Sequence, residues 1–386
     1  MYEVWTYRDA VDHVLDAFQS EQSPRNQRNA RRAVLEAYRD IAEHRVWSYF
    51  NRRGSVTTVA SQSTGTITYV HSTRTVTLTG ATFPTNARYY ELIISGIRYD
   101  IDTYVDSTHV TLTVASNPGA DISTDTTYLL YRDTYPLPDD FMQMGTLVDA
   151  TNSGRPMQLV SVDFILRSNR SVRSAGIPLF YAVTKVAENQ GGLGIIFSPT
   201  PNSARTFDFM YQARPRALQT EMYCTGLASV TSGSADVTGN ASTAWASKHA
   251  GCVLRLSADG VSLPTSLAGS PNNDLNPCAA QGVVYSVGGV SAITLAESAT
   301  QTLSNVKYTL SDPLDLEPGA MHTAFLRMAE LAYAIIGGRE DASIRRKRAE
   351  EALYNACAAD NRNNSPSEPL RGTGTLADIV ASVGNG

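Results

Sequence analysis

Apolar positions recur with helical spacing near both ends of this chain, and the spacing is lost between them. Residues 1–54 predict two helices. In the first helix Thr6-x-x-Asp9 resembles a capping box. The second helix is expected to begin at Ser23-Pro24, a cap residue followed by the proline favoured at the first helical position, and to end at residues 51–54.

Helical spacing returns after Pro318. Two further helices are predicted near 318–336 and 340–359, the first of them ending at Gly337-Gly338. With the helices near 7–20 and 24–50 they make four, each with a single apolar stripe. Isolated helices of this length are marginal in water, so the four are expected to pack together as one bundle, away from the rest of the chain.

From Ser55 to about Leu310 short runs of Val, Ile, Thr and Tyr alternate with Gly, Ser, Asn and Asp. This pattern is typical of many short antiparallel strands, and no helix is expected there. Its central part is expected to supply three strands, with a glycine hairpin at Gly191-Gly-Leu-Gly194 between the first two.

One β-rich pattern occurs twice. Gly96-Ile-Arg-Tyr99-Asp-Ile101 precedes Val110-Thr-Leu112, and Gly282-Val-Val-Tyr285-Ser-Val287 precedes Ile293-Thr-Leu295. The order of strand and turn signals therefore predicts a duplicated β-module. Tyr99 is expected to be equivalent to Tyr285 and Val110 to Ile293, in a small antiparallel sandwich or barrel, with residues 258–281 as a loop special to the second copy.

The predicted fold class is α+β, with a helical bundle formed by the two ends of the chain and antiparallel β-rich domains inserted between. The expected boundaries are N-terminal helices, 1–54; first β-module, 55–138; central β-rich region, 139–218; second β-module, 219–316; C-terminal helices, 317–360; and an extended C-terminal tail, 361–386.

Composition excludes some classes of function. The chain has 386 residues, a net charge of −5 and 42% hydrophobic residues, and its pI is about 5.7. An acidic protein is not expected to coat nucleic acid, and no apolar run is long enough to span a bilayer. The first nine residues lack the pattern of a signal peptide.

No group of residues predicts catalysis, a cofactor or a metal site. The six histidines are scattered, and none pairs with another at helical or strand spacing. Asp100, Asp102 and Asp106 lack the order of a calcium loop. A Cys252–Cys278 bridge is conceivable, but free thiols are favoured at this spacing.

Two basic clusters lie on predicted helices: Arg25, Arg28, Arg31 and Arg32 in the second helix, and Arg345, Arg346, Lys347 and Arg348 in the last. A solvated helix face is favoured over contact with DNA. Ion pairing with a neighbouring subunit is a third interpretation, for which Arg25, Arg28, Arg32, Arg345, Arg346 and Arg348 are the candidates.

Three segments carry a resemblance to a known family: Tyr135-Pro-Leu-Pro-Asp-Asp-Phe141; Phe197-Ser-Pro-Thr-Pro201 with Phe207-Asp-Phe-Met-Tyr211; and Val230-Thr-Ser-Gly-Ser234 with Trp245. The chain resembles head-to-tail adaptor proteins of tailed bacteriophages, particularly those similar to tail tubular protein A of short-tailed phages. Two β-modules of this size depart from the family, in which one insert is common.

The resemblance implies a structural virion protein and no enzyme, cofactor or membrane contact. It implies a twelve-fold ring in the neck, between the portal and the tail or nozzle protein, made in the host cytoplasm. Genomic DNA would pass through the lumen without tight binding. The alternative is a tail or neck protein whose β-modules bind host-surface glycans, which exposed aromatic side chains on one module would favour; a hydrolase of the host envelope is disfavoured.

The tail 361–386 is polar, yet one stripe of a short helix is apolar: Leu376, Ile379, Val380 and Val383. We expect this stripe to dock on the portal or a neighbouring subunit, with a frayed terminus as the other interpretation. Deleting residues 372–386 should leave the fold of the monomer intact and weaken co-sedimentation with portal rings. Equal assembly by the truncated and full-length proteins would contradict the docking role.

Overall fold

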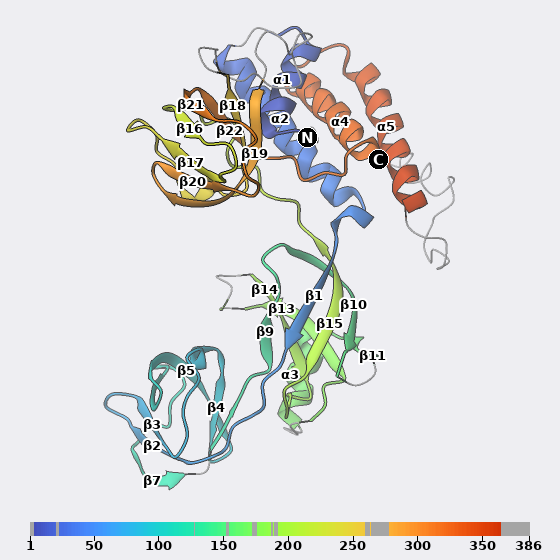
Figure 1. Cartoon of the computed structure of the whole chain (residues 1–386). Coiled ribbons are helices and arrows are strands. Elements are labelled where there is room, and N and C mark those ends of the chain that lie inside the picture. The colour runs from blue at the N-terminus through green and yellow to red at the C-terminus, as the bar shows by residue number, and fades with distance from the viewer. Residues whose placement is uncertain are drawn as a thin grey trace. The chain divides into compact units, whose positions relative to one another are not determined.

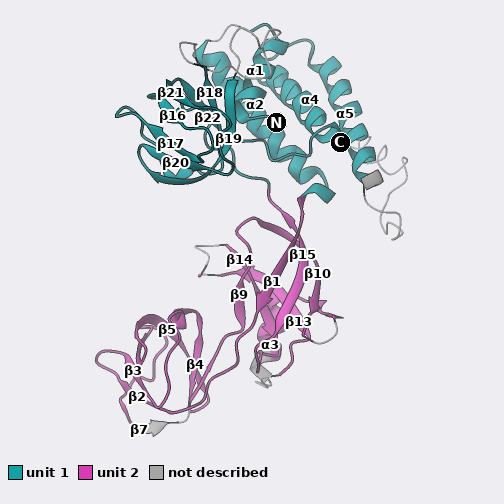
Figure 2. Ribbon diagram, in the orientation of Figure 1, with its two compact units in different colours: residues 1–49, 215–386 teal, residues 50–214 magenta. Residues whose placement is uncertain are grey.

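The computed structural model describes residues 4–20, 23–126, 128–151, 154–171, 176–186, 188, 192–258, 263 and 278–363. The chain divides into two compact units, residues 1–49 with 215–386, and residues 50–214 (Figure 2). The fold is mixed α+β with antiparallel sheets, which confirms the predicted class at this level.

The first unit contains the four expected helices, α1 (Tyr7–Ala17), α2 (Pro24–His44), α4 (Ala320–Ile336) and α5 (Ala342–Asn363). The capping box is present at Thr6 and Asp9, and the Ser23 side chain accepts from the amide of Asn26. One detail is wrong: residues 51–54 do not end the second helix. That helix stops at His44, a short 3-10 turn η1 (Ser48–Phe50) follows, and residues 51–54 open a strand.

Helix α4 packs against both α2 and α5, and α1 lies against α2 and α4 (Figure 1). Helices α2 and α4 run in opposite directions, because Tyr38 near the end of α2 meets Phe325 near the start of α4, while the Tyr333 hydroxyl near the end of α4 reaches Ser20, just before α2. We call the four packed helices α1, α2, α4 and α5 the helical layer. The start of α2 and the α4–α5 turn therefore lie at the same end of this layer.

Each β-module is one seven-stranded antiparallel sheet. The strands of the first are β2 (Thr66–Val70), β3 (Thr75–Thr79), β4 (Glu91–Ile94), β5 (Ile97–Asp106), β6 (His109–Leu112), β7 (Ile122–Thr126) and β8 (Tyr128–Tyr131). Those of the second are β16 (Ala228–Val230), β17 (Asp236–Gly239), β18 (Val253–Ser257), β19 (Cys278–Gly289), β20 (Ala292–Leu295), β21 (Leu303–Val306) and β22 (Tyr308–Ser311). The spatial orders are β7-β2-β3-β6-β5-β4-β8 and β21-β16-β17-β20-β19-β18-β22, which match strand for strand.

The hydrogen bonds of the two modules match as well. The Phe83 amide donates to the Ser107 carbonyl at 2.7 Å, and the Trp245 amide donates to the Val290 carbonyl at 2.9 Å. Both aromatic side chains are buried. The Tyr128 hydroxyl donates to the carbonyl of Thr64, as the Tyr308 hydroxyl does to that of Thr225. The predicted duplication is confirmed.

The register confirms one predicted equivalence and corrects the other. Val110 lies opposite Val76, and Ile293 lies opposite Val237, so Val110 and Ile293 are equivalent. Counting from these pairs, Tyr99 corresponds to Gly282 and not to Tyr285. The predicted match is wrong by three residues, and because side chains alternate along a strand an odd shift reverses the face. Tyr99 is accordingly 8% exposed and Tyr285 is 73% exposed.

The glycines that suggested the false match have different roles. Gly96 has φ +81° in the tight turn between β4 and β5. Gly282 lies within β19, where an added Cβ would meet Leu295 Cδ1 at 3.1 Å. The expected loop 258–281 is shorter than predicted, because Cys278–Gln281 belong to β19; residues 259–262 and 264–277 lie outside the described part of the chain.

Long strand β5 explains the curled shape of the first sheet. Its first half pairs with β4 and its second half with β6, with shifts in register between Ile101 and Thr103 and between Tyr104 and Asp106. Such bulges bend a strand. The sheet therefore curls around one core, to which Ile67, Leu92 and Val110 belong.

The central region forms two further sheets, in the orders β1-β15-β10-β11 and β12-β13-β14-β9. Their strands are β1 (Asn51–Thr57), β9 (Thr134–Pro136), β10 (Phe141–Asp149), β11 (Arg155–Pro156), β12 (Gln158–Leu159), β13 (Phe180–Lys185), β14 (Leu193–Ser198) and β15 (Thr206–Ala213). The three predicted strands are β13, β14 and β15, and the antiparallel pairing of β13 with β14 is confirmed. The predicted turn is placed too late, because Leu193 and Gly194 already belong to β14; Gly191 lies outside the described residues.

The prediction that residues 55–310 contain no helix is wrong, because α3 (Val162–Ser171) lies in the central region. Its side chain Ile165 is fully buried against Ala182 of β13 and Ile196 of β14. Val162, Ile165 and Leu166 follow helical spacing, so the sequence did carry a helical signal that the β-rich prediction missed. A helix of ten residues is marginal by itself, and its packing on β13 and β14 stabilises it.

The bundle prediction placed both β-modules away from the helices. For the second β-module this is wrong, because it packs against them. The Asp9 carboxylate in the first turn of α1 accepts from Arg255 of β18, at 2.9 Å from Nη1 and 2.6 Å from Nη2. Both residues are buried, and Asp9 also accepts from the Thr6 amide at 2.8 Å. One carboxylate thus caps α1 and ties it to the module.

Removing one partner of a buried ion pair leaves an uncompensated charge and typically costs about 3–5 kcal/mol. Arg255→Met should lower the free energy of unfolding of the first unit by that amount. All three tryptophans, Trp5, Trp47 and Trp245, lie in this unit, so urea unfolding followed by tryptophan fluorescence reports on it.

The exposed Arg32–Glu36 pair is the control, and Arg32→Ala should change stability by less than about 1 kcal/mol. The double variant Asp9→Asn with Arg255→Met should recover part of the loss, because it removes the buried charge and keeps a capping side chain. A double variant no more stable than Arg255→Met would contradict this account.

Candidate assembly surface

Four helix ends meet at one end of the helical layer, which we call the turn end. The α1 helix finishes there at Ala17, α2 begins at Pro24, and α4 and α5 are joined at residues 337–341. Arg339 and Arg345 hold these parts together. The Arg345 guanidinium lies 3.7 Å from the ring centroid of Phe18 and donates to the Ala17 carbonyl, and Arg339 donates to Ser20.

Glu330 of α4 is the buried centre of this arrangement, with 1% of its surface exposed. Its carboxylate contacts His13 of α1 at 3.0 Å, Arg327 of α4 at 2.7 Å and Arg345 of α5 at 2.8 Å. Burial raises the pKa of Glu330, but the His13 hydrogen bond and the two arginines outweigh burial and hold the pKa below its usual range. Glu330 therefore remains charged and joins three helices.

The predicted arginines separate into two groups. Arg345 pairs with Glu330 and with Asp341, and Arg32 pairs with Glu36. Both are engaged within their own chain. The others form no ion pair with any acid in the part of the chain that the structure describes: Arg25, Arg28, Arg346 and Arg348, together with Lys347. All five are exposed.

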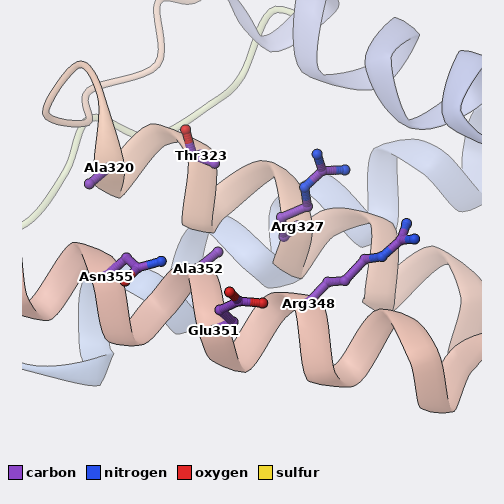
Figure 3. Close-up of a pocket in the computed structure, with 7 residues that line it drawn as sticks. All are labelled: Ala320, Thr323, Arg327, Arg348, Glu351, Ala352 and Asn355. Atoms are coloured by element: carbon purple, nitrogen blue, oxygen red, sulfur yellow. The ribbon is translucent and has the colours of Figure 1, made fainter.

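A groove with a volume of about 320 Å³ runs between α4 and α5. Arg327 and Arg348 line it with Glu351 and Asn355, and Ala320, Thr323 and Ala352 complete its walls (Figure 3). Figure 3 shows the Arg327 and Arg348 guanidinium groups toward one end of the groove and Asn355 toward the other. The groove thus offers cations at one end and small side chains along its length.

The buried apolar side chains of α5 are small. Ala349 and Ala356 are buried, whereas the large apolar side chains Ile344 and Tyr354 are 58% and 56% exposed. This is the reverse of an ordinary surface helix, which turns its large apolar residues inward. Aromatic side chains such as Tyr354 are enriched at protein interfaces.

The sequence did not single out Arg327 and Glu330. The signal that could have indicated them is a pair of charged residues three positions apart in a largely apolar helix. The other predicted partner-binding residues, Leu376, Ile379, Val380 and Val383, lie outside the described residues.

Other candidate chemistry has structural explanations. Asp102 lies near Arg74, and Asp106 accepts from Thr108 and contacts His109. The four cysteines have free thiols. Within the described ranges, no three His, Cys, Asp or Glu residues gather in a way that would hold a metal ion.

No protein-family model and no curated protein matches this chain. Among the described helices, none is long and apolar enough to cross a membrane.

His322 of α4 provides a pH test of the helical layer. It packs on Trp5 and Phe325, and burial, with a smaller effect of His13, lowers its pKa to about 4. Between pH 6.5 and about 4 the unfolded chain binds a proton that the folded chain resists. Stability should therefore fall as the pH is lowered through that window, by at most about 1.4 kcal/mol per pH unit for this group.

His322→Phe should reduce this fall, measured as the free energy of urea unfolding by tryptophan fluorescence between pH 7 and 4.5. His71→Gln, a change at an exposed histidine of the first module, is the control. If His322→Phe leaves the pH dependence unchanged, burial of His322 is not its cause.

Proposed function

We propose that this chain is a structural virion protein, a head-to-tail adaptor whose copies form a closed ring. The helices of the two chain ends would make the bundle at the core of each subunit, and the β-modules would form outer surfaces. The chain would act through assembly and not as an enzyme. The proposal combines the resemblance in three sequence segments with the surface of the helical layer.

The observation that carries the ring is the outer surface of α5. Burying Ile344 and Tyr354 against a neighbour would be favourable by roughly 25 cal/mol per Å² of apolar surface removed from water. A heterologous contact, in which α5 of one copy meets a different face of the next, closes into a ring when the rotation between copies is a whole fraction of a turn. The resemblance favours twelve copies.

The duplicated module supports a role as a building unit. Two copies of one fold, with the same strand order and equivalent hydrogen bonds, provide two similar surfaces. Among the described residues of the modules, Tyr285 is the aromatic side chain with high exposure, and the exposed large side chains of the first module are aliphatic: Val70, Ile97, Val105 and Val114. A cluster of exposed aromatics, the feature that would favour glycan binding, is not found on the described surfaces.

In such a ring the portal would lie on one side and the tail or nozzle protein on the other, at the neck of the virion. Genomic DNA would slide through the lumen. Each cation placed against a phosphate adds salt-dependent affinity, so we expect the lumen to lack dense rows of Lys and Arg.

The ring is tested by light scattering after gel filtration. The wild-type chain should have a mass well above the 41.7 kDa of one subunit. Ile344→Asp with Tyr354→Ser should shift the protein to the monomer while its circular dichroism stays that of the wild type, because both changes lie on an exposed helix surface.

The matched control is Ile97→Asp with Tyr285→Ser, the same residue types at similar exposure on the two modules. It should leave the mass unchanged. A monomeric wild-type protein at micromolar concentration, or a variant at Ile344 and Tyr354 that keeps the full mass, would contradict the proposed role of α5.

A further inference from the structure

We propose that the turn end of the helical layer, with the α4–α5 groove, is a docking site for an acidic helix of another protein. This inference rests on the proposed function for the identity of that protein, which would belong to a ring stacked on this one. The chemistry itself comes from the cations that the fold leaves unpaired.

The cations of the turn end divide by role. Arg339 and Arg345 are used internally, on Ser20, Phe18, the Ala17 carbonyl and the Glu330 carboxylate. Arg25, Arg28, Arg346, Lys347 and Arg348 are exposed and make no ion pair within the described residues. Nearby acids are fewer: Asp341 pairs with Arg345, and four others are exposed, namely Asp16, Glu340, Glu350 and Glu351. The surface therefore carries an excess of positive charge on a chain whose net charge is −5.

Helix dipoles add to this charge. Both α2 and α5 begin at the turn end, and neither has an acidic residue in its first turn. Cations near a helix N-terminus are unfavourable by about 0.3–1 kcal/mol each, because the dipole there is positive. Here both helices carry cations in their first two turns, and these cations are repelled by the positive end of the helix dipole. An anionic partner would offset that repulsion.

The groove determines the kind of anion. Its walls include the methyl groups of Ala320 and Ala352. Toward one end lie Arg348, unpaired within the described residues, and Arg327, which pairs with Glu330. A carboxylate side chain that is followed by small residues fits such a groove better than the continuous phosphates of a duplex do. Glu351 and Asn355 also line it, so the ligand should be neutral where it passes them. A helix with spaced acidic residues meets these requirements.

The tail of the same chain does not meet these requirements. Residues 364–386 contain Glu368 and Asp378 but also Arg371, and their regular feature is the apolar stripe. A neighbouring copy in the ring is also a poor partner, because the turn ends of all copies lie at the same level of a cyclic ring and carry the same charge.

The probes are a fluorescein-labelled peptide of repeated Glu-Ala-Ala-Ala-Glu blocks and a labelled DNA duplex, each titrated with the full chain at physiological salt and followed by anisotropy. Arg28→Glu with Arg346→Glu and Arg348→Glu should weaken peptide binding about tenfold or more, which corresponds to about 1.4 kcal/mol. The control carries the same change in net charge at exposed cations elsewhere in the unit, Arg39→Glu with Lys248→Glu and Lys307→Glu. It should have a much smaller effect.

A second variant separates the groove from general attraction. Ala352→Leu fills the groove without changing charge and should weaken binding of the peptide but not of the duplex. Equal effects of the two charge reversals, or no effect of Ala352→Leu, would overturn the site. Tighter binding of the duplex than of the peptide would make this a nucleic-acid surface.

Light scattering on the same proteins keeps the two proposals apart. The charge-reversed variant should retain the mass of the wild type; if it loses the ring, these cations belong to the contact between copies and the docking site is wrong. A monomeric wild-type protein that still binds the peptide through the groove would refute the ring and leave the docking site intact.

Discussion

The Asp9–Arg255 ion pair is the contact on which the arrangement of the first unit depends. Asp9 closes the capping box of α1, and Arg255 reaches it from β18, 246 positions later in the chain. Because both groups are buried, neither can lose the other without leaving a charge away from water. The pair therefore fixes where the second module lies on the helices. Around it, Arg255 also donates to the Val4 carbonyl and to Gln281.

A second polar centre lies at the end of β22, the strand next to β18. Asp312 accepts from Arg216 and from the amides of Gln219 and Thr220. The Arg216 carbonyl in turn accepts from the Tyr38 hydroxyl of α2. The module is thus held on α1 and on α2 by hydrogen bonds of specific geometry, and not by apolar packing alone.

The two modules show how one fold adapts to different surroundings. Counting from the matched bridges Gln62–Leu130 and Tyr223–Leu310, Asp312 occupies the position that Arg132 has in the first module. Arg132 stacks over Tyr135 and pairs with Glu188 of the central region. The same strand end therefore carries an anion in one copy and a cation in the other. The strand order and the inner hydrogen bonds are shared, while the residues that attach each copy to its neighbours differ.

The helices and the duplication were evident in the sequence, because each depends on local signals. A 3.6-residue period and capping side chains mark α1 and α2, the two glycines after Ile336 mark the end of α4, and the repeated order of strands and turns marks the modules. Candidate arginines could be listed, but the sequence does not indicate which of them are already paired. That division depends on Glu330, a buried acid whose partners come from three helices.

Tertiary structure alone decided the register and the placement of the second module. A tyrosine in each copy suggested that Tyr99 and Tyr285 are equivalent, yet strand pairing places one in the core and the other in solvent, because side chains alternate and a shift of three residues exchanges the faces. Helix α3 buries Ile165 against Ala182 of β13 and Ile196 of β14, a contact that stabilises a helix too short to be stable alone. The Asp9–Arg255 contact joins residues 246 positions apart in the chain. A local pattern of hydrophobic and polar residues cannot predict such a contact, because only folding brings the two side chains together.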